Sequence, residues 1–131
     1  MIWKCISPVS VVIPRKTKKD RVFQLNLNVY RNTHYIVLND VKQRYKDLML
    51  PIVQQAPKFE KLESIEYVLY ITKNRKDISN VCCIVDKFFS DVLTLGGVIP
   101  DDNYLYLPKV IYTFGGIVTD TPYVEIILKG K

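Results

Sequence analysis

Acidic side chains gather around one predicted helix in a chain of net charge +6. Asp77 precedes this helix, Asp91 lies inside it four residues after Lys87, and the pair Asp101 and Asp102 follows it. Carboxylates are the oxygen ligands that hold hard divalent cations, and an excess of positive charge favours polyanionic partners. A basic chain that concentrates carboxylates in one place is therefore predicted to bind phosphates and a divalent metal. This combination suggests a nuclease.

Spacing within the helix places three polar side chains on one face. Asn80, Lys87 and Asp91 are separated by seven and four residues, so at about 100° per residue they fall within about 40° of one another. Asp86 points about 100° away from Lys87 and is predicted to face elsewhere. Lys87 and Asp91 also have the spacing of a weak surface ion pair worth about 0.3–0.5 kcal/mol, and the spacing leaves that alternative open.

The acidic residues at the two ends of the helix have structural interpretations as well. Asp is a favoured N-cap and complements the helix dipole, so Asp77 could simply cap the helix. Asp101 and Asp102 follow Pro100 and could form a polar turn. Whether Asp102 meets Asp77 or lies a helix length away depends on how residues 96–103 double back. The spacing of the residues leaves this question open.

Basic residues outnumber acidic ones by 19 to 13 and occur in clusters. A first cluster joins two predicted strands and comprises Arg15, Lys16, Lys18, Lys19 and Arg21. A second cluster stands directly before Asp77 and comprises Lys73, Arg75 and Lys76. The first cluster fits a solvated hairpin loop as well as a loop that contacts phosphates. The second adjoins the acidic residues, which favours a role in binding nucleic acid.

Composition narrows the classes of site and compartment. No apolar run reaches the length of about 20 residues that a bilayer requires, so no membrane partner is expected. The N-terminus lacks the features of an export signal, and we expect a cytoplasmic protein. Cys5, Cys82, Cys83 and the single His34 are too few for the usual Cys and His zinc sites. Any metal is therefore expected to be a hard cation bound by oxygen.

Hydrophobic patterning predicts one α+β domain over residues 1–131, with two main helices on a mixed β-sheet. Strands are expected at 9–13, 22–28 and 62–73. The first helix is expected to be capped by Thr33 or Asn39 and to end near Pro51, and the second spans 79–95 before Gly96 and Gly97. Segments 104–114 and 123–129 are expected to form a hairpin. Tyr104, Tyr106 and Tyr112 would then alternate along one strand.

The segment 77–102 resembles the RusA family of Holliday junction resolvases, which is common in bacteriophages and prophages. That family has a basic lead-in to Asp-x-Asp-Asn, a helix with a lysine and an aspartate four residues later, a glycine-containing turn and an Asp-Asp pair. The matching positions here are Arg75, Lys76, Asp77, Asn80, Lys87, Asp91, Asp101 and Asp102. A basic residue after the acidic pair, Lys109, extends the resemblance.

The resemblance implies a structure-selective endonuclease that uses Mg²⁺ or Mn²⁺ and cuts four-way junctions and other branched DNA. Its metal ligands would be Asp77, Ser79, Asp91, Asp101 and Asp102, and Asn80 would orient them. Lys87 would stabilise charge in the transition state. Duplex arms would be bound by Arg15, Lys16, Lys18, Lys19, Arg21, Arg75, Lys76 and Lys109. Family members work as homodimers, and a phage-encoded protein would act in the cytoplasm of a bacterial host.

Two departures from the family pattern bear on catalysis. Ser79 stands where the family has a second aspartate, and about four extra residues separate Asn80 from Lys87. Four residues are close to one helical turn, so Lys87 returns to the same face about 6 Å further along. The missing carboxylate predicts weaker Mg²⁺ affinity. One alternative is therefore an inactive relative that binds DNA or a protein, and another is a basic inhibitor or adaptor without a nucleic acid role.

Overall fold

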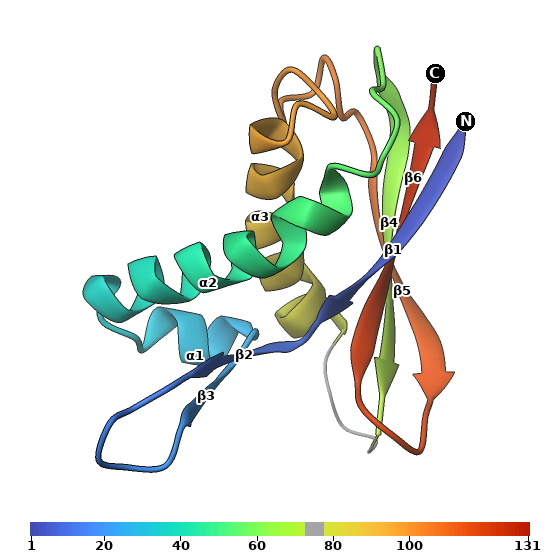
Figure 1. Cartoon of the computed structure of the whole chain (residues 1–131). Coiled ribbons are helices and arrows are strands. Elements are labelled where there is room, and N and C mark those ends of the chain that lie inside the picture. The colour runs from blue at the N-terminus through green and yellow to red at the C-terminus, as the bar shows by residue number, and fades with distance from the viewer. Residues whose placement is uncertain (73–77) are drawn as a thin grey trace.

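The computed structural model describes residues 1–72 and 78–131, and within them three helices accompany six strands (Figure 1). The elements run in the order β1 (Ile2–Pro8), β2 (Ser10–Ile13), β3 (Arg21–Gln24), α1 (Leu27–Arg31), α2 (Tyr35–Val53), β4 (Leu62–Ile71), α3 (Ile78–Leu95), β5 (Val110–Ile117) and β6 (Tyr123–Gly130). In this part of the chain, no helix combines the length and the apolar character needed to cross a membrane.

Four strands form a mixed sheet in the order β1-β6-β4-β5. Strand β6 is antiparallel to both β1 and β4, whereas β5 is parallel to β4. Tyr67 on β4 is paired with Ile126 on β6 and with Tyr112 on β5. The predicted α+β fold with a mixed sheet is confirmed.

The predicted hairpin of residues 104–114 and 123–129 is wrong, because β4 lies between β5 and β6. In β4, Tyr67, Val68 and Leu69 are buried in succession, so both faces of the strand are covered at this point. A strand of this kind belongs in the interior of a sheet with a partner on each side. Tyr104 and Tyr106 precede β5 and only Tyr112 is in the strand; Tyr104 is 78% exposed.

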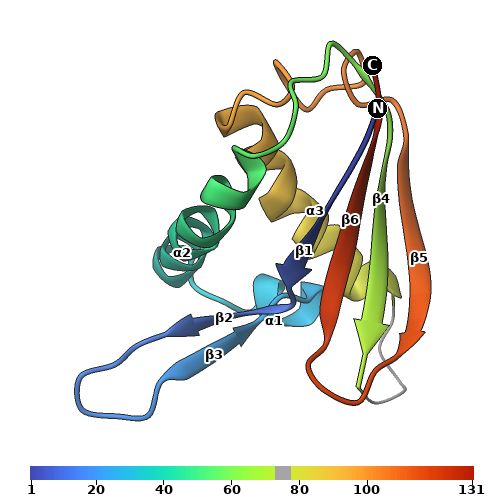
Figure 2. The same cartoon turned by 45° about the vertical axis from the view of Figure 1, so that its right-hand side comes forward.

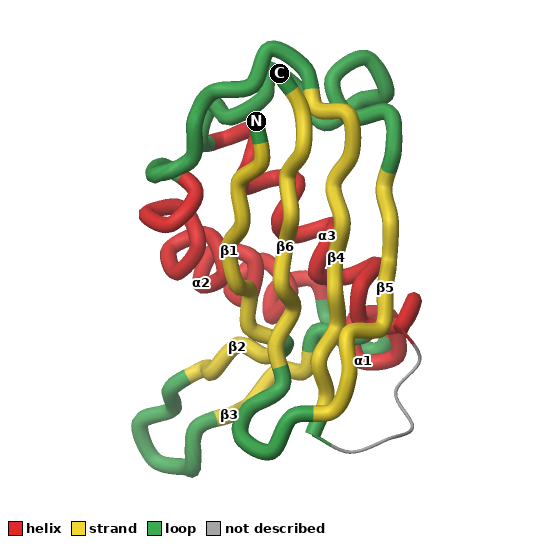
Figure 3. The backbone as a smooth tube through the Cα atoms, turned by 90° about the vertical axis from the view of Figure 1, so that its right-hand side faces the viewer, coloured by secondary structure: helices red, strands yellow, loops and turns green. Residues whose placement is uncertain are grey.

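Both long helices cover the same face of the sheet (Figures 1 and 3). Helix α3 packs on β4 and β5, and α2 crosses α3 and reaches β1 and β2. The buried stripe of α3 comprises Val81, Ile84, Val85, Phe88 and Val92, each worth about 1.5–3 kcal/mol when fully removed from water. Leu95 is 57% exposed, because it is the last helical residue before the turn at Gly96 and Gly97.

The N-terminal half differs from the prediction at its helix starts. The strand expected at 22–28 ends at Gln24 because the Asn26 side chain accepts a 2.9 Å hydrogen bond from the Val29 amide and caps α1. Helix α2 is capped by His34, whose Nδ1 accepts from the Ile36 amide at 3.3 Å, and not by Thr33 or Asn39. It continues past Pro51 to Val53. Strand β1 was not predicted.

Strands β2 and β3 form the predicted hairpin, and it stands apart from the sheet (Figure 2). Arg15 Nε donates a 2.8 Å hydrogen bond to the Lys19 carbonyl and closes the connecting loop. The hairpin lies at the opposite end of the molecule from the loop that follows α3, drawn in orange in Figure 1. The basic hairpin is thus positioned away from the acidic residues of that loop.

Candidate functional site

An open hollow of about 540 Å³ lies along α3 beside the loop that leads into β5. We call it the acidic hollow. Its lining residues are Cys83, Asp86, Lys87, Ser90 and Asp91 of α3, together with Asp102, Leu107 and Val110. Three of the predicted site residues, Lys87, Asp91 and Asp102, therefore border one hollow. Asp86, which was not predicted as a site residue, borders it too.

Lys87 and Asp91 do not form the ion pair that their spacing allowed. Among the described residues the only ion pair joins Arg44 to Asp40, at 3.0 Å. The Lys87 ammonium instead lies 5.7 Å from the centre of the Tyr30 ring, which is within the range of a cation–π contact. Both Lys87 and Asp91 are exposed. Their charges remain available to a ligand in the acidic hollow.

Asp101 and Asp102 take different roles in the loop after α3. Asp101 accepts hydrogen bonds from the Asp102 amide at 2.8 Å and from the Asn103 side chain at 3.0 Å, so it organises a turn. Asp102 is a lining residue of the acidic hollow. Its pKa is raised above the usual value, first by partial removal from water and further by the neighbouring carboxylates of Asp101 and Asp91. Asp101 thus has the structural role in the turn, and the adjacent Asp102 is the candidate for a chemical role.

Asp86 is the residue that sequence reasoning missed. Its Oδ1 accepts hydrogen bonds from the Tyr67 hydroxyl at 2.8 Å and the Ser90 hydroxyl at 3.0 Å, and its Oδ2 accepts from the Tyr112 hydroxyl at 2.9 Å. Asp86 does point to a different side of the helix from Lys87, toward the strands, but the hollow spans both sides and Asp86 also lines it. Ser90 at i+4 was a local signal for part of this arrangement. The two tyrosines lie on β4 and β5, and the sequence did not show that these strands are neighbours.

Burial and the Asp86 charge together hold these tyrosines in their neutral form. The pKa of Tyr67 is raised well above its usual value, first by burial and then by the nearby Asp86 carboxylate. The pKa of Tyr112 is raised by the same causes in the same order. Neutral phenols keep their protons and can donate to Asp86. Asp86 is thereby fixed between α3, β4 and β5 at the wall of the hollow.

Ser79 and Asn80 lie in the first turn of α3 and do not line the acidic hollow. Asp91 lies thirteen residues beyond Ile78, which is about 20 Å along the helix axis. Asp102 interacts with Asp91, so the loop after α3 brings Asp102 to the C-terminal half of the helix. The predicted residues Arg75, Lys76 and Asp77 fall in the segment 73–77, outside the described residues.

Two carboxylates of the acidic hollow fit a hard divalent cation. The pKa of Asp102 is raised in part by the Asp91 charge, and a bound cation would relieve that repulsion. Mg²⁺ is commonly held by one or two carboxylates and completes its shell with water and substrate phosphates. Over residues 1–72 and 78–131, no three His, Cys, Asp or Glu side chains are grouped as a metal site. Asp91 and Asp102 are the two carboxylates of the hollow that influence each other and could share a cation.

Residues that carry the RusA resemblance are divided between α3, the loop after it and the segment 73–77. Lys109 is exposed and immediately precedes Val110, a lining residue of the hollow. The five basic residues of the hairpin are exposed at the far end of the molecule (Figure 1).

At the level of sequence, no protein-family model matches the chain and no curated protein matches it.

Proposed function

We propose that this protein is a Mg²⁺- or Mn²⁺-dependent endonuclease that cuts four-way junctions and other branched DNA. One observation carries the proposal: Lys87, Asp91 and Asp102 border the same open hollow. Around this one cavity, the lysine can bind a phosphate and the two carboxylates can bind the divalent metal that accompanies it. The resemblance of residues 77–102 to RusA resolvases supplies the class of substrate.

The four charged residues of the acidic hollow have three tasks in this proposal. Asp91 and Asp102 hold the divalent cation, which when bound supplies Lewis-acid stabilisation of the scissile phosphate and activates water for attack. Lys87 lies on the same helix face and stabilises negative charge that develops on the phosphate oxygens. Asp86 keeps that face in place through its bonds to Tyr67 and Tyr112. Asp77 is assigned to the site by the resemblance alone.

Binding of the DNA arms is proposed to depend on phosphate contacts, which position a duplex without reading its sequence. The exposed basic residues available for this are Arg15, Lys16, Lys18, Lys19, Arg21 and Lys109, with Arg75 and Lys76 added by the resemblance. A homodimer would present two symmetric sites to a four-way junction. We propose that it is phage-encoded and acts on branched DNA in the bacterial cytoplasm.

Purified protein incubated with a labelled four-way junction or a linear duplex tests the proposal. With Mg²⁺ or Mn²⁺ we expect paired nicks in opposed strands of the junction, and none with EDTA. Asp102→Asn should abolish cleavage, whereas Asp120→Asn, at an exposed turn between β5 and β6, should not. Asp77→Asn tests the residue assigned by resemblance. Loss of cleavage in this variant would extend the site to the start of α3.

A second candidate is a relative that binds junctions without cutting them. Ser79 favours it, because a hydroxyl contributes no negative charge where the resembled family has a carboxylate. Tight junction binding without nicks in either metal would establish this candidate and reject the endonuclease. Absence of salt-sensitive DNA binding would reject both, since phosphate contacts release counterions and make the affinity depend on salt.

A further inference from the structure

A second hollow, of about 330 Å³, lies between α2 and α3. We call it the interhelix groove. It is lined by Asn39, Lys42, Gln43 and Lys46 of α2 and by Phe88, Asp91, Val92 and Leu95 of α3. Asp91 belongs to the walls of both the interhelix groove and the acidic hollow. The two hollows are therefore neighbours, and a polymer bound in one can continue into the other.

The positive charges of the groove are not neutralised by the helix that carries them. Lys42 and Lys46 are one turn apart, about 6 Å along α2. Asp40 is paired with Arg44 at 3.0 Å, and Asp47 accepts a 2.8 Å hydrogen bond from the Gln43 side chain. In the described part of the chain, neither lysine forms an ion pair. With Asp91 as the single acidic lining residue, the groove has a net positive charge.

The ring of Tyr30 lies close to one lysine of each hollow. The Lys42 ammonium lies 6.0 Å from the centre of the Tyr30 ring, and the Lys87 ammonium lies 5.7 Å from it. The ring itself packs edge-on against Phe88, with the centroids 6.3 Å apart. Lys87 of the acidic hollow and Lys42 of the groove thus both lie within 6.0 Å of the centre of one ring, and Lys46 lies one turn beyond Lys42.

We propose that the interhelix groove binds the sugar-phosphate backbone of the DNA strand that leaves the acidic hollow. Lys42 and Lys46 each contact a phosphate as point charges, and the Asn39 amide donates to a phosphate oxygen. Lysines and amides that meet the backbone position the strand and do not select its sequence. The inference rests on the proposed DNA-cutting function, and it assigns two phosphate contacts that the family resemblance does not supply.

Salt dependence of junction binding tests this assignment, because each phosphate contact releases condensed counterions. Affinity for a labelled four-way junction is measured in EDTA over a series of KCl concentrations. For Lys42→Gln/Lys46→Gln, the slope of log affinity against log salt should fall in magnitude by about 1.8 for duplex contacts, or about 1.4 for single-stranded ones. Between about 50 and 200 mM salt, the variant should lose about tenfold less affinity than the wild type.

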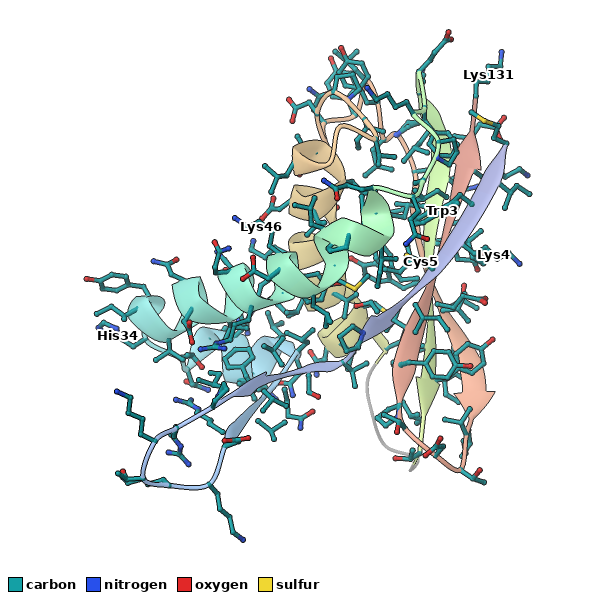
Figure 4. The ribbon with its side chains drawn as sticks, viewed as in Figure 1. Trp3, Lys4, Cys5, His34, Lys46 and Lys131 are labelled. Carbon is teal, nitrogen blue, oxygen red and sulfur yellow. The ribbon has the colours of Figure 1, made fainter. Side chains whose placement is uncertain are left out.

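Lys4→Gln/Lys129→Gln is the matched control. It removes the same charge from exposed residues of β1 and β6, and Figure 4 shows Lys4 on the side of the molecule opposite Lys46. This control should keep the wild-type slope, as should Lys42→Arg/Lys46→Arg, which retains both charges. Thermal unfolding of every variant confirms that the fold is intact.

Three outcomes overturn the inference and can be told apart. If the wild type binds the junction with a steep salt dependence but Lys42→Gln/Lys46→Gln keeps the same slope, the groove does not contact phosphates, and the proposed function stands. If the wild type shows no salt-sensitive DNA binding, the proposed function fails and the inference fails with it. An equal loss of slope in the Lys4→Gln/Lys129→Gln control would assign the effect to net charge, and would likewise reject the groove.

Discussion

The Tyr112 hydroxyl on β5 donates a 2.9 Å hydrogen bond to Asp86 on α3. Because Asp86 also accepts from Tyr67 on β4 and from Ser90 one turn along α3, one carboxylate joins the helix to two strands. Lys87 is the next residue on that helix. The orientation of the candidate catalytic lysine therefore depends on a hydrogen-bond network that lies beneath the acidic hollow.

Asp86→Ala should lower the free energy of unfolding by about 1–3 kcal/mol, because the buried Tyr67 hydroxyl loses its acceptor. Urea denaturation measures this loss. Asp47→Ala, at an exposed position of α2, should change stability by less than about 0.5 kcal/mol. In a Tyr67→Phe background, Asp86→Ala should be less destabilising, since the hydroxyl that needs the acceptor is gone. Additive effects of the two substitutions would contradict this network.

Lys87→Gln should leave the fold intact, because the side chain is exposed. If Lys87 stabilises charge in the transition state, the rate of junction cleavage should fall about 100- to 1000-fold. Single-turnover cleavage with excess protein measures the rate, and Lys129→Gln on β6 serves as the charge-matched control. A Lys87→Gln protein that cleaves within a few-fold of the wild-type rate would remove Lys87 from the proposed mechanism.

If the metal site extends to the start of α3, as the resemblance implies, Ser79→Asp should reduce the Mg²⁺ concentration needed for half-maximal cleavage. The substitution adds a carboxylate where the resembled family carries one, in the first turn of α3, and negative charge is favourable at that end of a helix. Cleavage measured across a Mg²⁺ titration provides the comparison. Ser79→Asn, which has similar size but no charge, should behave as the wild type. An unchanged Mg²⁺ requirement in Ser79→Asp would confine the cation to the acidic hollow.

Asp102→Asn should raise the melting temperature slightly at neutral pH. The pKa of Asp102 is higher in the folded protein than its usual value, so folding disfavours its ionised form. Above the raised pKa, ionised Asp102 therefore destabilises the fold. Below the usual value both states are protonated and the difference between wild type and Asp102→Asn should vanish. Thermal melts across this pH range measure it.

Asp102→Asn also tests cation binding independently of cleavage. Mg²⁺ should raise the melting temperature of the wild type at neutral pH, because a ligand that binds only the folded state stabilises it. The increase should be smaller in Asp102→Asn and unaffected in Asp120→Asn. A Mg²⁺ response that is identical in all three proteins would exclude Asp102 as a ligand, whatever the cleavage assay shows.

Patterning along the chain was sufficient to determine the elements next to the site. The alternation of apolar residues in β4 and the three- and four-residue spacing in α3 predicted a strand, a helix and their buried faces. The same spacing placed Lys87 and Asp91 on one helix face. These features were accessible because they depend on the local period of each element. The starts of the helices were predicted less well, because the caps at Asn26 and His34 depend on individual side-chain hydrogen bonds.

Only the tertiary structure decided which elements are neighbours. The apolar pattern of a strand indicates that it is buried but does not identify the neighbouring strands. The position of β4 between β5 and β6 was therefore not predicted. That insertion brings Tyr67 and Tyr112 together at Asp86, and the path of the loop after α3 brings Asp102 to Asp91. Residue types and spacing along one helix were thus determined by the sequence. The meeting of side chains from α3, β4, β5 and the loop was decided by strand order and loop path, which local periodicity does not encode.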